Sequence, residues 1–336
     1  MKEVICIGSA SKDIFFPTDK GVIFDTPEDL TSQRKIAFEL GAKYQVAERF
    51  ETVGGCAANV AYGLSKLGIN TGCYTKIGDD ILGQWILEKL QEGGVLLDAI
   101  WKEENCKSDL SVIIVDKNSG ERTIFSDREA NDKLEIIEEK ISDCQWFFIS
   151  SLNGDWQNNL KKIVDIATEK KIRIAFNPGQ KNIATDVSEI IKVLSKSELF
   201  VVNKDEALEI VSCIDQEASP EQLNNEIFLL GALKDAGAKI VVITDGIRGA
   251  WAAEGEAEVS FAQALVVEAL DTTGSGDAFT SGFFAALLKE KTLAECLGWG
   301  ITNSSSSVKE YGGQKGLLSQ DEIEKNVSKV FVEKIN

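Results

Sequence analysis

The chain of 336 residues contains no histidine. This absence excludes every catalytic triad that depends on histidine, every histidine metal site and an imidazole general base. Acid–base chemistry must therefore rest on Asp, Glu, Lys, Tyr or Cys. A bound metal is expected to be a hard cation held by oxygen ligands and by phosphate.

The sequence also lacks any C-x-x-C pair. Its cysteines are odd in number and widely spaced, which argues against a disulfide framework and against a zinc site. We expect reduced thiols that fill the core. The cysteines are Cys6, Cys56, Cys73, Cys106, Cys144, Cys213 and Cys296.

Long apolar runs and an excess of basic side chains are missing as well. No run approaches the length of a membrane span, and Val4–Ile7 is too short for the apolar region of a signal peptide. The chain has 36 Lys and Arg against 54 Asp and Glu, a formal net charge of −18. A negative field of this size disfavours nucleic acid and anionic membranes. We expect a cytoplasmic protein that binds neither.

Short β-rich runs alternate with helical patterns along the chain. This alternation is typical of a parallel sheet covered by helices on both faces. Helices are predicted over Ala57–Leu67 and Leu82–Leu90, where apolar residues recur on one face. The expected fold class is α/β, doubly wound, in a single domain over residues 1–336. The predicted strands are Val4–Gly8, Gly72–Ile77, Trp146–Ser150, Arg173–Asn177, Leu199–Asn203 and Lys239–Thr244.

Two segments interrupt the alternation. Residues 13–51 are polar and give few clear signals. Within residues 110–126, the runs Ser111–Val115 and Thr123–Ser126 flank the turn Lys117-Asn118-Ser119-Gly120. Two β-rich runs on either side of a polar, glycine-containing turn predict a β-hairpin.

The most informative stretch is Asp271-Thr272-Thr273-Gly274-Ser275-Gly276-Asp277-Ala278-Phe279. Its two glycines allow backbone N–H groups to approach an anion closely. A helical apolar pattern begins after them, so the unsatisfied N–H groups and the dipole of a helix N-terminus favour a phosphate at this point. Asp277 lies in the first turn, where its carboxylate can take a proton from a hydroxyl beside the phosphate. The alternative is that Ser275 and Asp277 only cap the helix.

This stretch resembles the second signature of the ribokinase-like, or PfkB, family of carbohydrate kinases, D-T-x-G-A-G-D, with Ser275 in place of the commoner Ala. A second cluster, Gly54-Gly55-Cys56-Ala57-Ala58-Asn59-Val60-Ala61, resembles the first signature of that family. Taken alone, this cluster is also explained by a turn before a helix with small residues on one face. The resemblance runs from Val4 to about Gly316.

The resemblance implies which residues bind the phosphoryl acceptor. The family pattern places Gly54, Gly55 and Asn59 beside the acceptor hydroxyls, and an amide such as Asn59 can both donate to and accept from a hydroxyl. Asp13 follows the first predicted strand at the carboxyl end where α/β sheets bind ligands. In the family this position accepts hydrogen bonds from two acceptor hydroxyls, whereas a surface turn explains Asp13 locally.

The resemblance also implies a site for ATP and Mg²⁺. Asn203-Lys204-Asp205-Glu206 matches the N-x-x-E element, so Asn203 and Glu206 would organise Mg²⁺ through water, although a helix cap explains the same residues. Thr244 and Gly246 belong to a T-x-G-x-x-G nucleotide segment. Thr273 and Gly313, the latter in the last loop of the family pattern, are expected beside the nucleotide.

The function implied is transfer of the γ-phosphoryl group of ATP to a hydroxymethyl group of a ribose- or fructose-like sugar. Asp277 is the expected general base, and the amides of Gly274, Ser275 and Gly276 form the expected anion hole. The family's small β-sheet lid would occupy residues 13–51 and 110–126 and exclude water. Some relatives bind a monovalent cation or dimerise through their lids; both stay open here.

Three alternatives remain at this point. A nucleoside acceptor would stack on aromatic residues such as Phe15, Phe16, Tyr44 and Phe50. A sugar phosphate would require the lid cations Arg34, Lys43 or Arg49 to point inward. A catalytically silent sugar-binding protein would keep the fold without turnover.

Overall fold

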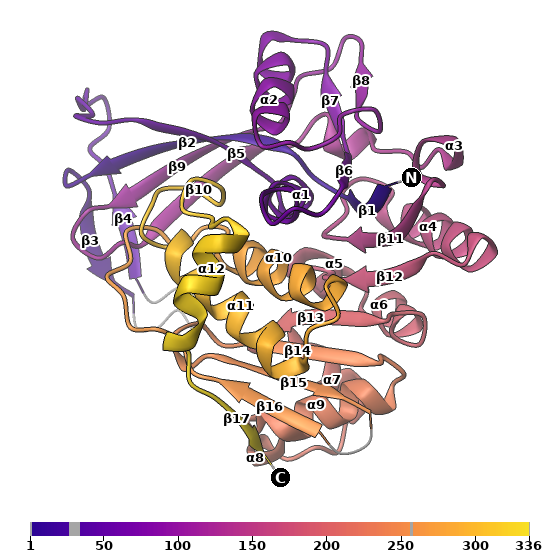
Figure 1. Ribbon diagram of the computed structural model, residues 1–336. Helices are drawn as coiled ribbons and strands as arrows, with labels where there is room; N and C mark the ends of the chain where they lie inside the picture. Colours follow the sequence, from indigo (N-terminus) through magenta and orange to yellow (C-terminus); the bar gives the residue numbers. More distant parts are fainter. Residues whose placement is uncertain (1, 27–33, 256–257, 336) are drawn as a thin grey trace.

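A nine-stranded sheet forms the centre of the computed structural model, which describes residues 2–26, 34–255 and 258–335 (Figure 1). From one edge to the other its strands are β17 (Val332–Ile335), β16 (Glu258–Ala262), β15 (Ala250–Glu254), β14 (Ile240–Thr244), β13 (Leu199–Asn203), β12 (Arg173–Phe176), β11 (Cys144–Ile149), β1 (Lys2–Ile7) and β6 (Thr71–Tyr74). The strands from β6 to β14 run parallel, and β15 to β17 are antiparallel. This arrangement confirms the predicted α/β class with a mostly parallel sheet.

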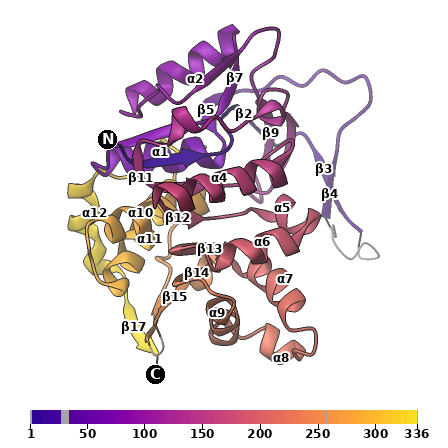
Figure 2. The same ribbon diagram turned by 90° about the vertical axis from the view of Figure 1, so that its right-hand side faces the viewer.

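Helices cover both faces of this sheet (Figures 1 and 2). One face carries α1 (Cys56–Lys66), α10 (Ser275–Leu288), α11 (Leu293–Ser307) and α12 (Gln320–Asn326). The other carries α4 (Trp156–Lys170), α5 (Gln180–Thr185), α6 (Val187–Leu194), α7 (Lys204–Ile214) and α9 (Glu226–Asp235). The remaining helices are α2 (Ile81–Glu92), which packs on the lid, and the short α3 (Glu138–Ile141) and α8 (Pro220–Leu223).

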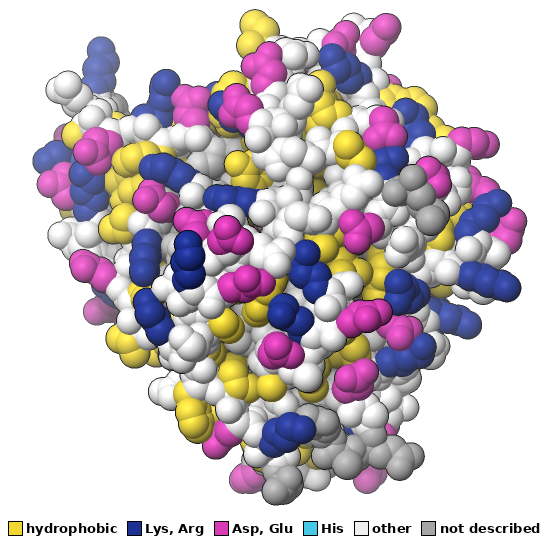
Figure 3. Space-filling view, in the orientation of Figure 1, with side chains coloured by type: hydrophobic (Ala, Val, Ile, Leu, Met, Phe, Trp, Pro, Cys, Tyr) yellow, Lys and Arg dark blue, Asp and Glu magenta, His cyan; other side chains and the backbone are white. Residues whose placement is uncertain are grey.

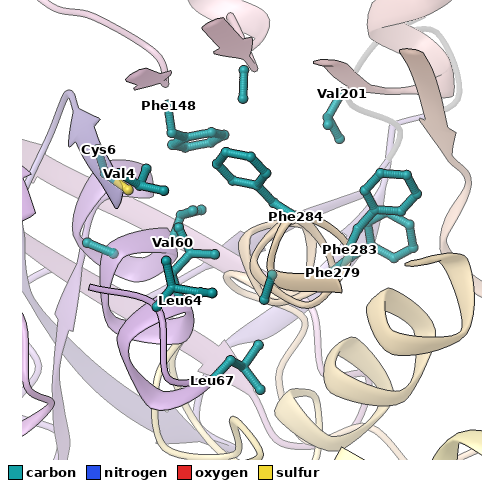
Figure 4. Packing of buried hydrophobic residues seen from close by; sticks show 14 of the residues in the cluster. Val4, Cys6, Val60, Leu64, Leu67, Phe148, Val201, Phe279, Phe283 and Phe284 are labelled. Carbon is teal, nitrogen blue, oxygen red and sulfur yellow. The ribbon is translucent and has the colours of Figure 1, made fainter. Parts of the chain in front are cut away.

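Strand β1 shows why the strands of the central sheet could be predicted from the sequence. Val4 and Cys6 join the core on the α1 and α10 side, while Ile5 and Ile7 join the core on the α4 side. A strand buried on both faces reads as a continuous apolar run. Figure 4 shows Val4 and Cys6 on the side of the sheet that faces Val60 of α1 and Phe284 of α10.

A separate four-stranded sheet forms the lid. Its order is β10 (Arg122–Asp127), β9 (Leu110–Asp116), β2 (Ser11–Thr18) and β5 (Phe50–Gly54). The antiparallel pairing of β9 with β10 confirms the predicted hairpin. Phe15, Ile113 and Val115 form a small core of its own, covered by Phe50 and Tyr311.

The prediction that residues 13–51 and 110–126 build one small sheet was partly wrong. Among the described residues, strands β3 (Val22–Asp25) and β4 (Arg34–Ala37) pair with each other and make a second, two-stranded sheet. The lid strand β2 also begins at Ser11, so Asp13 lies inside a strand rather than in a turn after β1. Positions 27–33 of the predicted lid lie outside the described residues.

The predicted strand Gly72–Ile77 is divided in two. Tyr74 ends β6, and the next strand, β7 (Lys76–Gly78), pairs with β8 (Trp101–Glu103) in another small sheet. Between them, the Thr75 hydroxyl donates to Asn131 Oδ1 at 3.0 Å and the Thr75 carbonyl accepts from the Trp101 N–H at 3.0 Å. After Tyr74 the backbone leaves the central sheet and pairs with β8 instead of β1. The apolar run in the sequence continues across this change, so it does not reveal the break.

In the part of the chain that the structure describes, no helix is both long and apolar enough to cross a membrane. On the face shown in Figure 3, Lys and Arg side chains are interspersed with Asp and Glu. This face therefore carries no stripe of one charge of the kind that binds a nucleic acid backbone.

Candidate active site

Helix α10 begins at the glycine turn for which the sequence predicts an anion site, called the cradle below. Gly274 is its N-cap residue with φ +74°, and no side chain makes a capping hydrogen bond there. A Cβ at Gly274 would lie 2.6 Å from Gly313 Cα, so the two loops approach each other as closely as glycine allows. The Ser275 N–H donates to the Thr272 carbonyl at 3.2 Å, and no side chain of the described residues caps the start of α10, as an anion site requires.

Asp277 lies in the first turn of α10 and is half-buried. Its Oδ2 accepts a hydrogen bond of 2.9 Å from Asn59 Nδ2 of α1, and the Cys56 thiol also donates to its carboxylate. The carboxylate therefore faces α1 instead of capping its own helix. This geometry contradicts the alternative that Asp277 only caps α10.

Burial is the main reason that the pKa of Asp277 is raised from 3.8 to about 6. The negative charges of Asp13 and Glu206 raise this pKa further, while the hydrogen bonds from Asn59 and Cys56 lower it. A base with a pKa near the working pH combines a large ionised fraction with a useful affinity for a proton. Asp277 has the electrostatic environment of a general base.

Asn59 links the two halves of the site. Its Nδ2 donates to Asp277, and its Oδ1 accepts from Gln314 Nε2 at 3.2 Å. Asn59 and Gln314 are both buried. Both ends of the Asn59 amide are engaged, so this side chain orients the base, a role that the sequence did not indicate.

Asp13 lies on the lid strand β2 opposite the glycine turn. It is buried, and its Oδ1 accepts a hydrogen bond of 2.9 Å from the Ser11 hydroxyl. Burial raises the pKa of Asp13, whereas Ser111, Ser11 and Arg128 oppose that rise. A Cβ at Gly54 would collide with the Asp13 carboxylate. The structure thus brings Asp13, Gly54 and Gly55 together at the start of α1.

A cavity of about 400 Å³ opens on the other side of the cradle. The predicted nucleotide residues Thr244 and Gly246 line it together with Ser275 and Gly276 of the signature. Its other lining residues are Ile247, Gly249, Ala264, Leu265, Val266, Val267, Ala269, Thr272, Phe279, Ile301, Ser304, Ser305 and Val308. A mostly apolar cavity that ends at a helix N-terminus suits an aromatic base joined to phosphates.

Thr273 and Gly313 do not line this cavity but support the cradle. The Thr273 amide and hydroxyl both donate to Asp271 Oδ1, at 3.0 and 2.7 Å. Asp271 Oδ2 accepts from the Gly312 N–H at 2.9 Å. The buried Asp271 therefore ties the signature to the last loop of the predicted site.

Asn203 and Glu206 form the capping box that starts α7. Asn203 Oδ1 accepts from the Glu206 N–H at 2.8 Å, and Glu206 Oε2 accepts from the Asn203 N–H at 3.0 Å. Burial raises the pKa of Glu206, whose charge in turn raises that of Asp277. No group of three His, Cys, Asp or Glu side chains in the described ranges could hold a metal, so Mg²⁺ would need oxygen ligands from the nucleotide as well.

Several residues that a nucleoside or sugar phosphate acceptor would require do not lie where such an acceptor could contact them. Phe15 is fully buried in the lid core, so it cannot stack on a base. Arg34 pairs with Asp25 at 3.7 Å and Arg49 with Glu51 at 2.9 Å, and both arginines are largely exposed. A different lid cation, Arg122 of β10, reaches the signature: its Nη1 donates to Thr272 Oγ1 at 2.7 Å.

Similar proteins were found by sequence and by structure. A protein of Archaeoglobus fulgidus described as an uncharacterized sugar kinase is 29% identical over 262 residues, which cover 76% of this chain and 98% of that protein. A Haemophilus influenzae ribokinase is 27% identical, with 84% and 88% covered.

Solved structures show the same fold. A putative ribokinase II of E. coli in complex with ATP and Mg²⁺ superposes with a TM-score of 0.78 at 19% identity, covering 98% of this chain and 100% of that one. An Arabidopsis thaliana ribokinase complexed with ribose and ATP gives 0.77 at 20% identity, with 97% and 98% covered. Residues 1–320 match the model of the pfkB family carbohydrate kinases, and the chain therefore belongs to that family.

Proposed function

We propose that this protein transfers the γ-phosphoryl group of ATP to a hydroxymethyl group of a ribose- or fructose-like sugar. The observation that carries the proposal is the position of Asp277: a carboxylate with a pKa of about 6 lies in the first turn of α10, beside the uncapped amides of the cradle. The ribokinase names among the relatives and the structure solved with ribose and ATP support a sugar acceptor.

In the proposed reaction, Asp277 takes the proton of the acceptor hydroxyl. The hydroxyl oxygen forms a bond to the γ-phosphorus as the bond from that phosphorus to the β–γ bridging oxygen breaks, and ADP leaves. The amides of Gly274, Ser275 and Gly276 stabilise the charge on the transferring group. Mg²⁺ would neutralise phosphate charge, with Asn203 and Glu206 holding it through water. Asp13, Gly54, Gly55 and Asn59 position the acceptor.

Arg122 adds a cation at the phosphate end. Its guanidinium comes from the lid and touches Thr272, which lines the nucleotide cavity. In a chain with a net charge of −18, a local cation is needed where phosphates bind. We assign Arg122 to nucleotide phosphates when the lid is closed over the site.

The test is ADP release from ATP and Mg²⁺ with a panel of ribose, fructose, adenosine, cytidine and fructose 6-phosphate. Turnover with ribose or fructose above the other acceptors supports the proposal. A preference for a nucleoside would instead identify a nucleoside kinase. A 28% identical protein of Thermococcus kodakarensis is named a cytidine kinase. Tight sugar binding without turnover would identify a silent sugar-binding protein.

The kcat/KM for the sugar is expected to rise with pH up to about 6 and then to level off. Only ionised Asp277 can accept the hydroxyl proton, and its pKa is raised to about 6. Below this value the rate should fall about tenfold per pH unit, because kcat/KM reports the free enzyme. Circular dichroism at each pH checks that the fold persists. A profile that is flat between pH 5 and 8 would remove Asp277 from the base role.

Asn203→Ala and Glu206→Ala are expected to raise the Mg²⁺ concentration needed for half-maximal rate. Both side chains already satisfy a capping box, so each variant also loses part of a cap, about 1 kcal/mol of stability. Ser219→Ala, which breaks the capping box at the start of α8, is the matched control. If the Mg²⁺ requirement is unchanged in both variants, the role of Asn203 and Glu206 is limited to capping α7.

The lid is expected to form a homodimer with the lid of a second copy. On the edge strand β10 of the lid, Phe125 is 64% exposed and Ile124 is 45% exposed, and apolar side chains at sheet edges favour cover by another chain. Light scattering should give the mass of two chains at micromolar concentration. A monomer under these conditions contradicts the dimer.

A further inference from the structure

We propose that Arg128 is a substrate-binding residue of this kinase and that it selects a neutral polyhydroxy acceptor. In this reading one hydroxyl of the sugar accepts a hydrogen bond from Arg128 Nη1 while it donates its own proton to Asp13. The inference rests on the proposed function and names the substrate class of the same site.

The starting observation is a buried donor without an acceptor. Arg128 follows β10, and its Nη2 donates to Ser111 Oγ at 3.2 Å. Its Nη1 is buried and has no hydrogen-bond partner among the residues that the structure describes. The carboxylate nearest to it in the same group, Asp109, has its Oδ2 at 3.9 Å from Nη1, beyond hydrogen-bond distance.

Asp109 is also occupied by other donors. Its Oδ1 accepts from the N–H groups of Ala130 and Asn131 at 3.0 and 3.2 Å, and its Oδ2 accepts from Asn131 Nδ2 at 2.6 Å. The Asp109 side chain is fully buried and fixed by these bonds. It balances the charge of Arg128 without satisfying Nη1. An unsatisfied buried N–H is unfavourable, so an oxygen atom from outside the chain is the expected partner.

The unsatisfied donor lies beside the acceptor carboxylate. Ser111 of β9 is directly opposite Asp13 of β2 in the strand register, and both Ser111 and Arg128 lower the pKa of the Asp13 carboxyl. Because Arg128 Nη2 donates to the Ser111 hydroxyl, the guanidinium is held next to the strand position that faces Asp13. A guanidinium N–H and a carboxylate on either side of one serine present a donor and an acceptor to the same ligand. A sugar hydroxyl can serve both, since it donates one proton and accepts through two lone pairs.

The local charge favours a neutral acceptor over an anionic one. Arg128 is the one cation among the described contacts of this group, and Asp13 and Asp109 already surround it. The negative charges of Asp13 and Glu206 also raise the pKa of Asp277. A carboxylate or phosphate on the acceptor would meet this excess of negative charge, whereas a hydroxyl would not. The lid arginines Arg34 and Arg49, two of the cations that a sugar phosphate would require, are paired with carboxylates and largely exposed.

The experiment compares the parent with Arg128→Gln and Arg128→Lys, with Arg173→Gln as the matched control. Arg173 lies at the start of β12, where its guanidinium packs on Trp146 outside this site. The acceptors are ribose, fructose, their monodeoxy analogues and fructose 6-phosphate. Steady-state kinetics give KM and kcat for the acceptor and KM for ATP, and titration calorimetry with a non-hydrolysable ATP analogue gives sugar affinity.

Arg128→Gln is expected to raise the sugar KM and Kd at least tenfold, with kcat and the KM for ATP within about threefold of the parent. Arg128→Lys should be intermediate, because it keeps the charge but loses the planar fork. One deoxy analogue should bind the parent about tenfold more weakly than its sugar and should bind Arg128→Gln no differently from that sugar. A merely structural arginine would not produce this selective loss of discrimination.

Three outcomes would overturn the inference: an unchanged sugar affinity in Arg128→Gln, a loss confined to fructose 6-phosphate, or equal effects in Arg173→Gln. Failure of the proposed function has a different signature. If the parent binds sugar but releases no ADP, the kinase assignment fails and the calorimetric comparison still tests Arg128. If the parent binds neither sugar nor deoxy sugar, the assignment of Arg128 to a neutral sugar is wrong.

Discussion

Replacing Asp277 by Asn should lower kcat by about 10²–10⁴, the usual contribution of a general base. We expect the upper end of this range because the chain has no histidine that could take over the proton. Asn keeps the shape of Asp and can still accept the hydrogen bond from Asn59, yet it cannot take the acceptor's proton at neutral pH. The sugar Kd should therefore remain close to that of the parent.

The same variant should not be less stable than the parent at pH 8. The pKa of Asp277 is raised from 3.8 to about 6 on folding, so the folded state binds its proton more tightly than the unfolded state. Ionisation of Asp277 then lowers stability as the pH rises through this window, and the loss is complete above about 6. Asn removes that loss. In addition, α10 has no side-chain cap to lose.

The measurement is kcat and thermal midpoint on one preparation, at pH 8 and at pH 4. Any gain in midpoint should shrink at pH 4, where Asp277 is largely protonated in the folded state. Asp321→Asn, an exposed first-turn residue of α12, is the matched control and should behave like the parent. A kcat within threefold of the parent in Asp277→Asn would exclude this carboxylate from the chemical step.

Gly274→Ala should be the second most damaging change, with kcat lowered by about 10²–10³, the effect of losing one donor to a developing anion. Gly274 has φ +74°, where a side chain costs about 1–2 kcal/mol. Its Cβ would also lie 2.6 Å from Gly313 Cα. The Cβ is bonded directly to the backbone and Gly313 Cα belongs to it, so one loop must move, and the amides of the cradle move with it.

The kinetics of Gly274→Ala are best compared with Gly231→Ala. Gly231 lies in α9, and a Cβ there meets no atom within 4 Å. That control should keep full activity and the parent's thermal midpoint or a slightly higher one. Gly274→Ala should lose several degrees of midpoint together with its kcat. Normal kcat with a lowered midpoint would mean that the cradle amides do not contact the transferring group.

Much of the fold was predictable because its signals are local. The apolar run of β1 and the helical pattern of α1 arise from burial on both faces of a strand and on one face of a helix. The hairpin of β9 and β10 followed from a polar turn between two β-rich runs. Segments without such signals were predicted less well, as the separate sheet of β3 and β4 shows.

The same distinction holds for the site. The glycines and Asp277 occur within one short stretch, so the sequence alone determined that a glycine turn and a carboxylate lie together at a helix start. The capping box of Asn203 and Glu206 shows the limit of such patterns, since a cap and a metal-organising element use the same residues. Local sequence cannot separate two roles that have the same local geometry.

Only the tertiary structure decided the environment of these groups. Asn59 and Asp277 are 218 residues apart, and Arg122 and Thr272 are 150 apart, yet each pair is joined by a hydrogen bond. The raised pKa of Asp277 depends on burial and on charges from β2 and α7. The unsatisfied Nη1 of Arg128 depends on Asn131 and Ala130 having already filled Asp109. The sequence determined which chemical groups this protein has, whereas packing of distant segments determined their protonation and their free hydrogen-bonding capacity, because desolvation and Coulomb energies depend on distances in space.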